Sequence, residues 1–439
     1  MAEVCIIGAG SSGVTVAKSL KAAGVSFDIF EKGSDIGGMW RYENDNGQSS
    51  CYASLHIDTS RPNLGYPDFP IDPTLPDFLS HAQFLGHLER YADHFGIRPL
   101  VTFNTEVESV LPDGDGFLVT LKGGETRHYR AVVVANGHLS APRLPAFDGQ
   151  FDGDTIHSHH YRTAAPYEGK RVMVVGIGNS AVDIVVDIAR RAEQVILSTR
   201  RSAWVMPKYL FGIPVDQVSS RIARLTRLPT PQVRRIMARL VRTFAGRQER
   251  FGLRRPEHPM WREHATLSND LLPYVGHGYI ALKPNVERLN GDTVLFEDGS
   301  EEKVDAIVYA TGYRLDFPFL SEAVFDPEME AGRLYRRMVS LHHPGLIFAG
   351  LLQPVGPTIP LVEIQGRWIA AYLAGRIALP DRADQTAEVE AHRDYQRRTY
   401  LDAARYVLEV DFKTYARQMA KDMAAASATP AAQGGDHHP

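Results

Sequence analysis

Two glycine-rich stretches are the first residues of this chain whose types and spacing could do chemistry. The earlier stretch, residues 8–13 (Gly-Ala-Gly-Ser-Ser-Gly), follows a predicted short buried strand over residues 3–7 and precedes a helical pattern that ends near Ala23. Glycines at its first, third and sixth positions allow a tight turn, close approach of the backbone to a phosphate, and close packing of helix on strand. The free amides at the start of such a helix attract anions. The stretch therefore predicts a site for a dinucleotide pyrophosphate.

An acidic residue stands where such a site would use it. A second predicted strand, residues 27–30, ends at Glu31. A carboxylate at the end of the second strand accepts hydrogen bonds from ribose hydroxyls and repels a 2′-phosphate. Strand, loop, helix, strand and acid are all in order, which disfavours a chance turn and suits FAD.

The later stretch, residues 176–181 (Gly-Ile-Gly-Asn-Ser-Ala), has the same flanks. It follows the strand pattern of residues 171–175 and precedes a helical pattern over 182–191. The next strand ends in Arg200-Arg201, with no acid at the matching position. Arginines there can pair with a 2′-phosphate through charge-assisted hydrogen bonds. We therefore expect NADPH, with NADH as the alternative. A solvated surface pair is the other interpretation of these arginines.

The segment before the second stretch carries a more specific pattern, Phe151-x-Gly153-x-x-x-His157-x-x-x-Tyr161. With it, the chain resembles the class B flavin-containing monooxygenases, which share F-x-G-x-x-x-H-x-x-x-[FY]. The related Baeyer–Villiger enzymes have Trp at the last position, so Tyr161 favours the monooxygenase branch. We expect His157 and Tyr161 to be linker or packing residues rather than acid–base catalysts.

Further short motifs extend the resemblance over residues 1–380. They are Gly-Gly-Met-Trp at 37–40, Ala-Thr-Gly-Tyr at 310–313, Gly-Leu-Leu-Gln-Pro-x-Gly at 350–356, and Glu-x-Gln-x-Arg-Trp at 363–368. The residues that the resemblance implies for FAD are Gly8, Gly10, Ser12, Gly13, Glu31, Lys32, Met39, Trp40, Asp58, Thr59, Val107 and Gln353. Those implied for NADPH are Gly176, Gly178, Asn179, Ser180, Ala181, Arg200 and Arg201.

One position departs from the family pattern and gives the only catalytic candidate, Asp58. Similar enzymes have an Asn beside the flavin, six residues after the Tyr of a Y-x-S-[LV] segment, and here Tyr52 is followed by Asp58. An ionised Asp58 would repel a peroxide anion on the flavin, which favours the electrophilic hydroperoxide and attack by sulfur or nitrogen. If an arginine such as Arg61 neutralises Asp58, oxidation of ketones becomes more favourable.

The resemblance implies a flavin-dependent monooxygenase of the N,N-dimethylaniline monooxygenase type. NADPH reduces FAD, the reduced flavin takes up O2 to form a C4a-hydroperoxyflavin, and one oxygen atom passes to a thioether or an amine. The protein orients the reactants and excludes water. One alternative is Baeyer–Villiger oxidation of ketones. Another is an uncoupled NADPH oxidase or a redox-sensing flavoprotein.

The elements around both stretches predict an α/β fold with two Rossmann-like dinucleotide-binding domains, the NADPH domain inserted into the FAD domain. We expect the FAD domain at 1–150 and 321–425 and the NADPH domain at 151–320. A helical, Arg-rich insertion is expected at about 205–270, and a disordered tail at 426–439.

The Arg-rich insertion has several interpretations. Residues 221–255 hold eleven arginines and one acidic residue, Glu249, with apolar residues at helical spacing. The segment is expected to be a solvated lid packed on its apolar face, which could shape substrate entry. A basic amphipathic helix on a membrane surface is the second interpretation. No recognised nucleic-acid module is found.

Composition excludes several other classes. The chain has 439 residues, a formal net charge of −4 and two cysteines, Cys5 and Cys51, which cannot form a disulfide framework. The start of the chain lacks signal-peptide features and no long apolar stretch predicts a membrane span, so we expect a cytoplasmic protein without a transmembrane anchor. No metal-ligand spacing and no G-x-S-x-G element occur. We expect a homodimer that uses a small-molecule substrate and O2.

Overall fold

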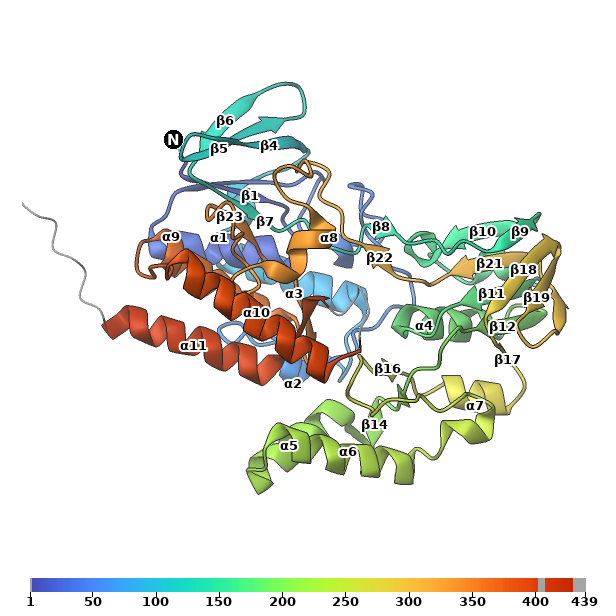
Figure 1. Ribbon diagram of the computed structural model, residues 1–439. Coiled ribbons are helices and arrows are strands. Elements are labelled where there is room, and N and C mark those ends of the chain that lie inside the picture. The colour runs from blue at the N-terminus through green and yellow to red at the C-terminus, as the bar shows by residue number, and fades with distance from the viewer. Residues whose placement is uncertain (1, 402–406, 429–439) are drawn as a thin grey trace, which may run out of the picture.

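The computed structural model of the protein (Figure 1) describes residues 2–401 and 407–428. Its first layer is a parallel five-stranded sheet in the order β23-β7-β1-β2-β3. These strands are β1 (Val4–Ile7), β2 (Phe27–Phe30), β3 (Val101–Thr102), β7 (Ala131–Val134) and β23 (Leu346–Phe348). The four residues of β1 and of β7 are fully buried apolar runs, as expected of a parallel sheet covered on both faces.

A second parallel five-stranded sheet has the order β10-β21-β11-β12-β17. Its strands are β10 (Asp154–His157), β11 (Arg171–Val175), β12 (Gln194–Ser198), β17 (Ala281–Lys283) and β21 (Ala306–Tyr309). In each sheet, the strand that precedes a glycine loop, β1 or β11, holds the middle position. Because all of the second sheet lies between β7 and β23 in the sequence, the prediction of two Rossmann-like domains with one inserted into the other is confirmed. The residue boundaries given above stay a prediction.

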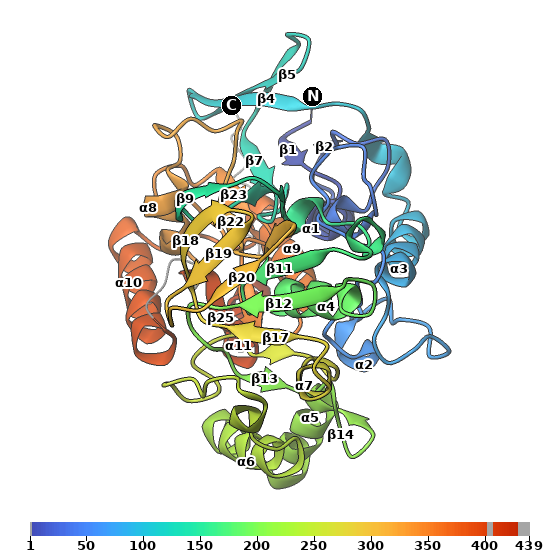
Figure 2. The same cartoon turned by 90° about the vertical axis from the view of Figure 1, so that its right-hand side faces the viewer.

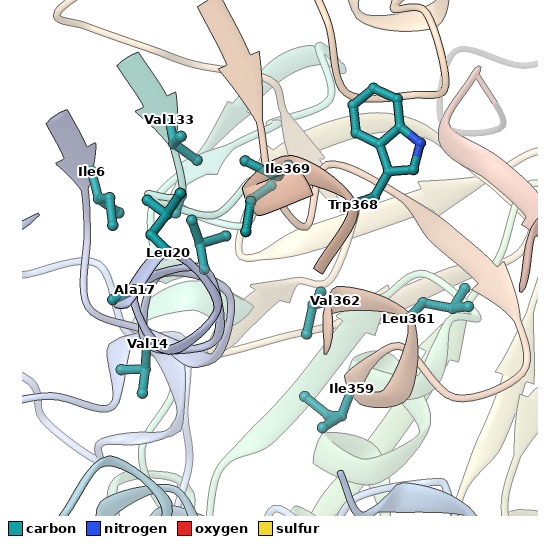
Figure 3. Packing of buried hydrophobic residues seen from close by; sticks show 14 of the residues in the cluster. Ile6, Val14, Ala17, Leu20, Val133, Ile359, Leu361, Val362, Trp368 and Ile369 are labelled. Carbon is teal, nitrogen blue, oxygen red and sulfur yellow. The ribbon is translucent and has the colours of Figure 1, made fainter. Parts of the chain in front are cut away.

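The largest core lies between the first sheet and two helices from opposite ends of the chain. α1 (Ser11–Ala23) packs against α9 (Ile359–Leu373). Figure 3 shows Leu20 and Val133 facing Ile369 across this contact. A Cβ at Gly366 of α9 would lie 3.0 Å from the Thr15 carbonyl oxygen of α1, so the two helices can approach closely only with glycine there. This contact returns the C-terminal part of the chain to the first domain.

Each domain also has a smaller sheet, which is antiparallel in the first domain and mixed in the second. In the first domain it consists of β4 (Val107–Asp113), β5 (Gly116–Leu121) and β6 (Thr126–Tyr129). In the second domain, which faces the viewer in Figure 2, it consists of β9 (Asp148–Phe151), β18 (Val286–Gly291), β19 (Thr293–Phe296) and β20 (Glu301–Lys303). β6 and β7 are separate strands, with Arg130 between them.

The two chain crossings between the domains form one small ribbon. β8 (Ala141–Pro142) and β22 (Tyr313–Arg314) pair in antiparallel fashion, between the two halves of the molecule in Figure 1. The outgoing and returning connections are therefore tied to each other by hydrogen bonds.

The segment between β12 and β17 folds as a separate lobe. It contains the short strands β13 (Val205–Met206), β14 (Tyr209–Leu210), β15 (Ile213–Pro214) and β16 (Thr266–Leu267), and the helices α5 (Val215–Thr226), α6 (Thr230–Phe244) and α7 (Leu271–Gly276). α5 and α6 form a hairpin that projects beyond both domains (Figures 1 and 2). Their apolar faces are buried around Val218, Val233 and Met237, so the predicted helical segment does pack on its apolar face.

Two C-terminal helices were not expected from the sequence. α10 (Arg382–Thr399) and α11 (Phe412–Ala428) cover the first domain beside α9. Arg336 joins them, because its guanidinium pairs with Glu388 of α10 at 3.2 Å and with Asp422 of α11 at 2.8 Å. α11 ends at Ala428, so residues 426–428 of the predicted disordered tail are helical. The rest of that tail lies outside the described residues.

Candidate functional site

The two glycine loops have matching backbone geometry. The first glycine of each has a positive φ, +101° at Gly8 and +133° at Gly176. A Cβ at Gly8 would lie 2.8 Å from the Ala135 carbonyl oxygen, and one at Gly176 would lie 2.4 Å from the Ala310 carbonyl oxygen. Both loops therefore turn tightly against the end of the neighbouring parallel strand, and only glycine fits at either turn.

The glycine at the third position of each loop is there for a different reason. Gly10 and Gly178 are extended N-cap residues of α1 and of α4 (Asn179–Ile188), with φ values of −75° and −74°. A Cβ at Gly178 would meet no heavy atom within 4 Å, and one at Gly10 would make only an ordinary 3.6 Å contact with the Gly38 Cα. The protein itself does not need glycine at these two positions. A phosphate seated on the free amides of each first helical turn would need that space, so both loops fit a pyrophosphate group.

The sixth position differs between the two loops. A Cβ at Gly13 would lie 1.8 Å from the Gly8 carbonyl oxygen, so the first loop is closed more tightly than the second. In the second loop Ala181 occupies this place, and its Cβ lies 3.5 Å from where a Cβ of Gly176 would be. The alanine is therefore accommodated by a slightly wider loop.

Glu31 is buried beside the first loop and organises it. Its Oε2 accepts a hydrogen bond from the Ala9 amide at 2.7 Å. Its Oε1 accepts hydrogen bonds from the Gly33 amide at 2.8 Å and from Asn46 Nδ2 at 3.0 Å. Since a carboxylate oxygen has two acceptor positions, Oε2 retains one for a ribose hydroxyl. Asn46 was not identified from the sequence.

Other residues predicted for the first site gather around the same loop. A Cβ at Gly38 would lie 3.1 Å from the Gly10 Cα, so the turn that contains Met39 and Trp40 lies against the glycine loop. Ser49 Oγ donates a hydrogen bond to the Met39 carbonyl oxygen at 2.8 Å. The Trp40 ring packs edge-on against the Phe84 ring, with the ring centroids 4.9 Å apart. The structure therefore holds the Met39–Trp40 turn from both sides.

The region of Gln353 also reaches this loop. A Cβ at Gly350 would lie 2.2 Å from Ser12 Oγ, which places the 350–353 segment on the start of α1. Gln353 is half-buried at the start of β24 (Gln353–Val355), which pairs with β25 (Glu409–Asp411).

Lys32 and Val107, two further residues predicted for the first site, are linked through Glu106. The Lys32 ammonium forms an ion pair of 2.9 Å with Glu106, and the buried Val107 begins β4 at the next residue. The charge of Lys32 is therefore already compensated by the protein.

Asp58 has a charge partner that the sequence did not indicate. Lys208 Nζ lies 2.9 Å from Asp58 Oδ1. The lysine comes from the inserted segment, and its backbone amide donates to Asn269 Oδ1 at 2.9 Å. The suggested partner Arg61 is wrong, because its guanidinium instead binds the carbonyl oxygens of Pro73 and Leu75. The half-buried Thr59 follows Asp58.

A second carboxyl group belongs to the same cluster. Asp183 of α4 accepts a 2.7 Å hydrogen bond from the Tyr52 hydroxyl, and the Tyr52 ring lies within the core of the second domain. Burial, followed by the charge of Asp58, raises the pKa of Asp183 to about 7. Burial also raises the pKa of Asp58, with Lys208 opposing it. Burial acts against the charge on Lys208, but Asp58 and Asp183 outweigh it and raise the Lys208 pKa.

The inserted segment is also fastened to the second glycine loop. Thr266 Oγ1 donates to the Ile177 carbonyl oxygen at 2.7 Å, and the Leu267 amide donates to Asn179 Oδ1 at 3.0 Å. The side-chain oxygen of Asn179, a predicted NADPH residue, therefore holds β16 in place. Ser180 beside it is half-buried, and Arg200 and Arg201 are exposed at the end of β12.

His157 and Tyr161 make the contacts of packing residues. The Tyr161 hydroxyl donates to Asp187 at 2.6 Å, and its ring is buried and stacked on Tyr167. His157 Nδ1 accepts from the His159 amide at 3.1 Å. Burial lowers the pKa of His157 to about 4, so the ring is neutral at physiological pH.

The described ranges, 2–401 and 407–428, contain neither a candidate metal centre nor a candidate membrane span. Within them, no three His, Cys, Asp or Glu side chains are placed to hold a metal ion, and no helix combines the length and apolar character of a membrane span. Cys5 and Cys51 are free and buried.

Comparison of the sequence with known families gives a match over almost the whole chain. A sequence model of the flavin-binding monooxygenase-like family matches residues 1–431. Flavin-containing monooxygenase 5 of Rattus norvegicus is 35% identical over 432 residues, which cover 93% of this chain and 80% of the relative. The N-oxide-forming dimethylaniline monooxygenase 2 of the same species is 34% identical over 444 residues, which cover 96% and 83%.

Solved structures agree with this match. S-allyl-L-cysteine S-oxygenase from Allium sativum superposes with a TM-score of 0.71 at 28% identity and covers 96% of this chain and 88% of that one. An open structure of cyclohexanone monooxygenase gives a TM-score of 0.72 at 18% identity and covers 97% and 98%, which shows a shared fold alone. The chain is a flavin monooxygenase and belongs to the flavin-binding monooxygenase-like family.

Proposed function

We propose that the protein is an FAD- and NADPH-dependent monooxygenase that transfers one oxygen atom from O2 to a soft nucleophile, a thioether or an amine. The observation that carries the proposal is the pair of matched glycine loops, each with a vacant Cβ position at the start of a helix, in a chain of this family. Two relatives are named as an S-oxygenase and as an N-oxide-forming monooxygenase, which favours sulfur and nitrogen as the atoms oxidised.

We assign the first loop to FAD and the second to NADPH. Glu31 beside the first loop favours a ribose with free hydroxyls, whereas the exposed Arg200 and Arg201 at the second site favour a 2′-phosphate. When bound, the flavin accepts a hydride from the nicotinamide, activates O2 and supplies one oxygen atom to the substrate, while the other leaves as water.

The residues of the chain bind, orient and exclude water around this chemistry. The first turns of α1 and α4 hold the two pyrophosphates. Tyr52 anchors the loop that carries Asp58 to α4 of the second domain. The inserted segment holds Lys208 over the same loop, so the site is closed by residues from both domains. The proposal includes a cytoplasmic homodimer, as expected from the sequence.

A second candidate, Baeyer–Villiger oxidation of ketones, is favoured by the Asp58–Lys208 ion pair. An isolated carboxylate would repel a developing anion on the oxygen donor, but a cation 2.9 Å away offsets that repulsion. The pair thus makes an anionic, nucleophilic oxygen donor more tolerable than Asp58 alone would. Tyr161, in place of Trp, continues to favour the first candidate.

Product analysis separates the candidates. The FAD-loaded protein is supplied with NADPH and O2 and with a thioether, a tertiary amine or a cyclic ketone. Sulfoxide or N-oxide in proportion to NADPH consumed supports the first candidate, and ester or lactone supports the second. Peroxide in proportion to NADPH with every substrate would contradict both and identify an oxidase.

A further inference from the structure

We propose that Gln365 and Tyr415 are positioning residues of the first dinucleotide site, an inference that rests on the proposed binding of FAD there. They hold the 350–353 segment on the start of α1 through a chain of three hydrogen bonds. Neither side chain belongs to a glycine loop, and the sequence indicated no role for Tyr415. The C-terminal helix α11, which carries Tyr415, thereby takes part in organising the site.

The chain of hydrogen bonds begins at the backbone of Gly350 and ends at the backbone of Arg336. The Gly350 amide donates to Gln365 Oε1 at 2.9 Å. Gln365 Nε2 donates to the Tyr415 hydroxyl oxygen at 2.9 Å, and that hydroxyl donates to the Arg336 carbonyl oxygen at 2.8 Å. The side chains of Gln365 and Tyr415 are both buried, so water does not compete for these bonds.

The three bonds can point in one direction only. A backbone amide can only donate and a backbone carbonyl group can only accept. Burial raises the pKa of Tyr415 to about 12, so its hydroxyl keeps the one proton that it gives to Arg336. Tyr415 must then accept from the side-chain nitrogen of Gln365, which leaves Oε1 of Gln365 toward Gly350. Loss of the Tyr415 hydroxyl would therefore release Gln365 and act on Gly350 from two bonds away.

The segment that this chain holds lies against the first glycine site. Gly350 has a φ of +78°, and a Cβ there would overlap Ser12 Oγ. Ser12 belongs to the first turn of α1, whose free amides are proposed to hold the pyrophosphate of FAD. A bond that fixes the Gly350 amide therefore fixes the segment beside the phosphate site and, three residues later, the predicted flavin neighbour Gln353.

The C-terminal part of the chain also holds the other end of this segment. Gln353 begins β24, which pairs in parallel with β25, so that Gln353 lies opposite Glu409. α11 follows β25 directly and packs against α9 (Figure 1). Near the end of α11, Asp422 accepts a hydrogen bond from Trp368 Nε1 of α9 at 3.1 Å. Tyr415 therefore projects from a helix that is held near both ends, as precise positioning requires.

The test reads the segment and the cofactor separately in the FAD-loaded protein. Y415F removes only the last donor of the chain, and Q365L removes both side-chain links. Amide hydrogen exchange at Gly350 should become at least tenfold faster in both variants. Release of FAD after dilution, followed by flavin fluorescence, should be about tenfold faster in Y415F and faster still in Q365L. Y415F/Q365L should match Q365L, because both substitutions break one chain.

Y129F is the matched control. The buried Tyr129 hydroxyl donates to Asp28 Oδ2 at 2.6 Å in the other core of the first domain, whereas Tyr415 belongs to the core between α1 and α9. Y129F should lower the thermal unfolding midpoint about as much as Y415F does. It should leave both the hydrogen exchange at Gly350 and the release of FAD unchanged. Y415F and Y129F alone decide the outcome if Q365L does not fold.

Three results would overturn the proposal. Equal exchange at Gly350 in Y415F and Y129F would exclude the chain and leave the assignment of FAD untouched. Faster exchange at Gly350 without faster release of FAD would show that the chain serves the fold and not the site. Failure of the wild type to retain FAD would overturn the proposed function, and this inference with it.

Discussion

The ammonium group of Lys208 lies 2.9 Å from Asp58 Oδ1 and joins the loop after β2 to the segment inserted after β12. The two residues are distant in sequence and belong to different domains. The ion pair therefore holds the two domains together at this point and also sets the charge at the site.

Replacing Lys208 by Met should leave Asp58 half-buried without its cation. We expect a loss of stability of about 1–2 kcal/mol, less than for a fully buried pair because both groups are partly exposed, and a roughly tenfold fall in any ester-forming activity relative to sulfoxidation. Denaturant unfolding and product ratios measure both. In a double-mutant cycle with D58N, the loss of stability in the double variant should be well below the sum of the losses in the two single variants. Full additivity would contradict the pairing.

Asp183→Asn should change how stability depends on pH. The pKa of Asp183 rises from 3.8 in the unfolded chain to about 7 in the folded protein. As pH rises, the unfolded chain therefore loses this proton before the folded protein does. The wild type loses stability as pH rises between these two pKa values. Between about pH 5 and about pH 8 the variant should lose about 1–3 kcal/mol less than the wild type. Urea unfolding at both pH values measures this, with the exposed Asp148→Asn as the control. Parallel pH profiles for the wild type and D183N would refute the assignment.

Two tyrosines offer a matched pair of variants on α4. The Tyr52 hydroxyl binds Asp183 across the domain boundary, and the Tyr161 hydroxyl binds Asp187 within the second domain. Both Tyr→Phe variants should cost about 1 kcal/mol of stability. Only Y52F should also slow flavin reduction by NADPH, because only Tyr52 ties the two domains together. Stopped-flow reduction rates decide this, and an equal slowing in both variants would argue against a role for Tyr52 between the domains.

The glycine loops should respond differently to substitution. G13A places a Cβ 1.8 Å from the Gly8 carbonyl oxygen, so the loop must open, and we expect loss of FAD together with lower stability. G178A meets no atom of the protein and should leave the unfolding midpoint unchanged, yet weaken NADPH binding at least tenfold. Calorimetric titration and thermal unfolding test both variants. Unchanged NADPH affinity in G178A would contradict the placement of the pyrophosphate.

Arg200 and Arg201 should set the choice of nicotinamide cofactor. R200A/R201A removes the charges that we expect to bind the 2′-phosphate. The loss should cost roughly 1–3 kcal/mol of binding free energy. The KM for NADPH should therefore rise about tenfold or more, while the KM for NADH stays nearly constant. Steady-state kinetics with both cofactors make the comparison, and an equal rise for both would show that these arginines are only surface residues.

The two dinucleotide loops could be predicted from sequence because their pattern is local. Glycines, flanking strands and the helix that follows lie within a few residues of one another, and their backbone needs are met within that unit. α4 begins three residues before the predicted helical pattern of 182–191, because Gly178 is the N-cap of the helix and Asn179 already belongs to it.

Lys208 and Asp183 could not be predicted in this way. Their roles depend on how the inserted segment and α4 meet the loop of Asp58, which is a tertiary contact without a periodic signal. Proximity in sequence pointed to Arg61, whose side chain turns to backbone carbonyl groups of its own loop.

The helix α10 was missed for a related reason. Only Gln385, Val389 and Gln396 of α10 are buried, so the sequence lacks the apolar stripe that predicts an amphipathic helix. Ion pairs of Arg336 and Arg337 with Glu388 hold it against the first domain instead.

The central claim is that the protein uses reduced flavin to activate O2 for transfer to a substrate, and one measurement tests it most directly. The FAD-loaded protein is reduced with NADPH in the absence of oxygen and mixed with oxygenated buffer while flavin absorbance is followed. We predict that oxidised flavin returns slowly, that a thioether accelerates its return, and that one sulfoxide forms per NADPH. An immediate return of oxidised flavin, with peroxide released whether or not a substrate is present, would contradict the account.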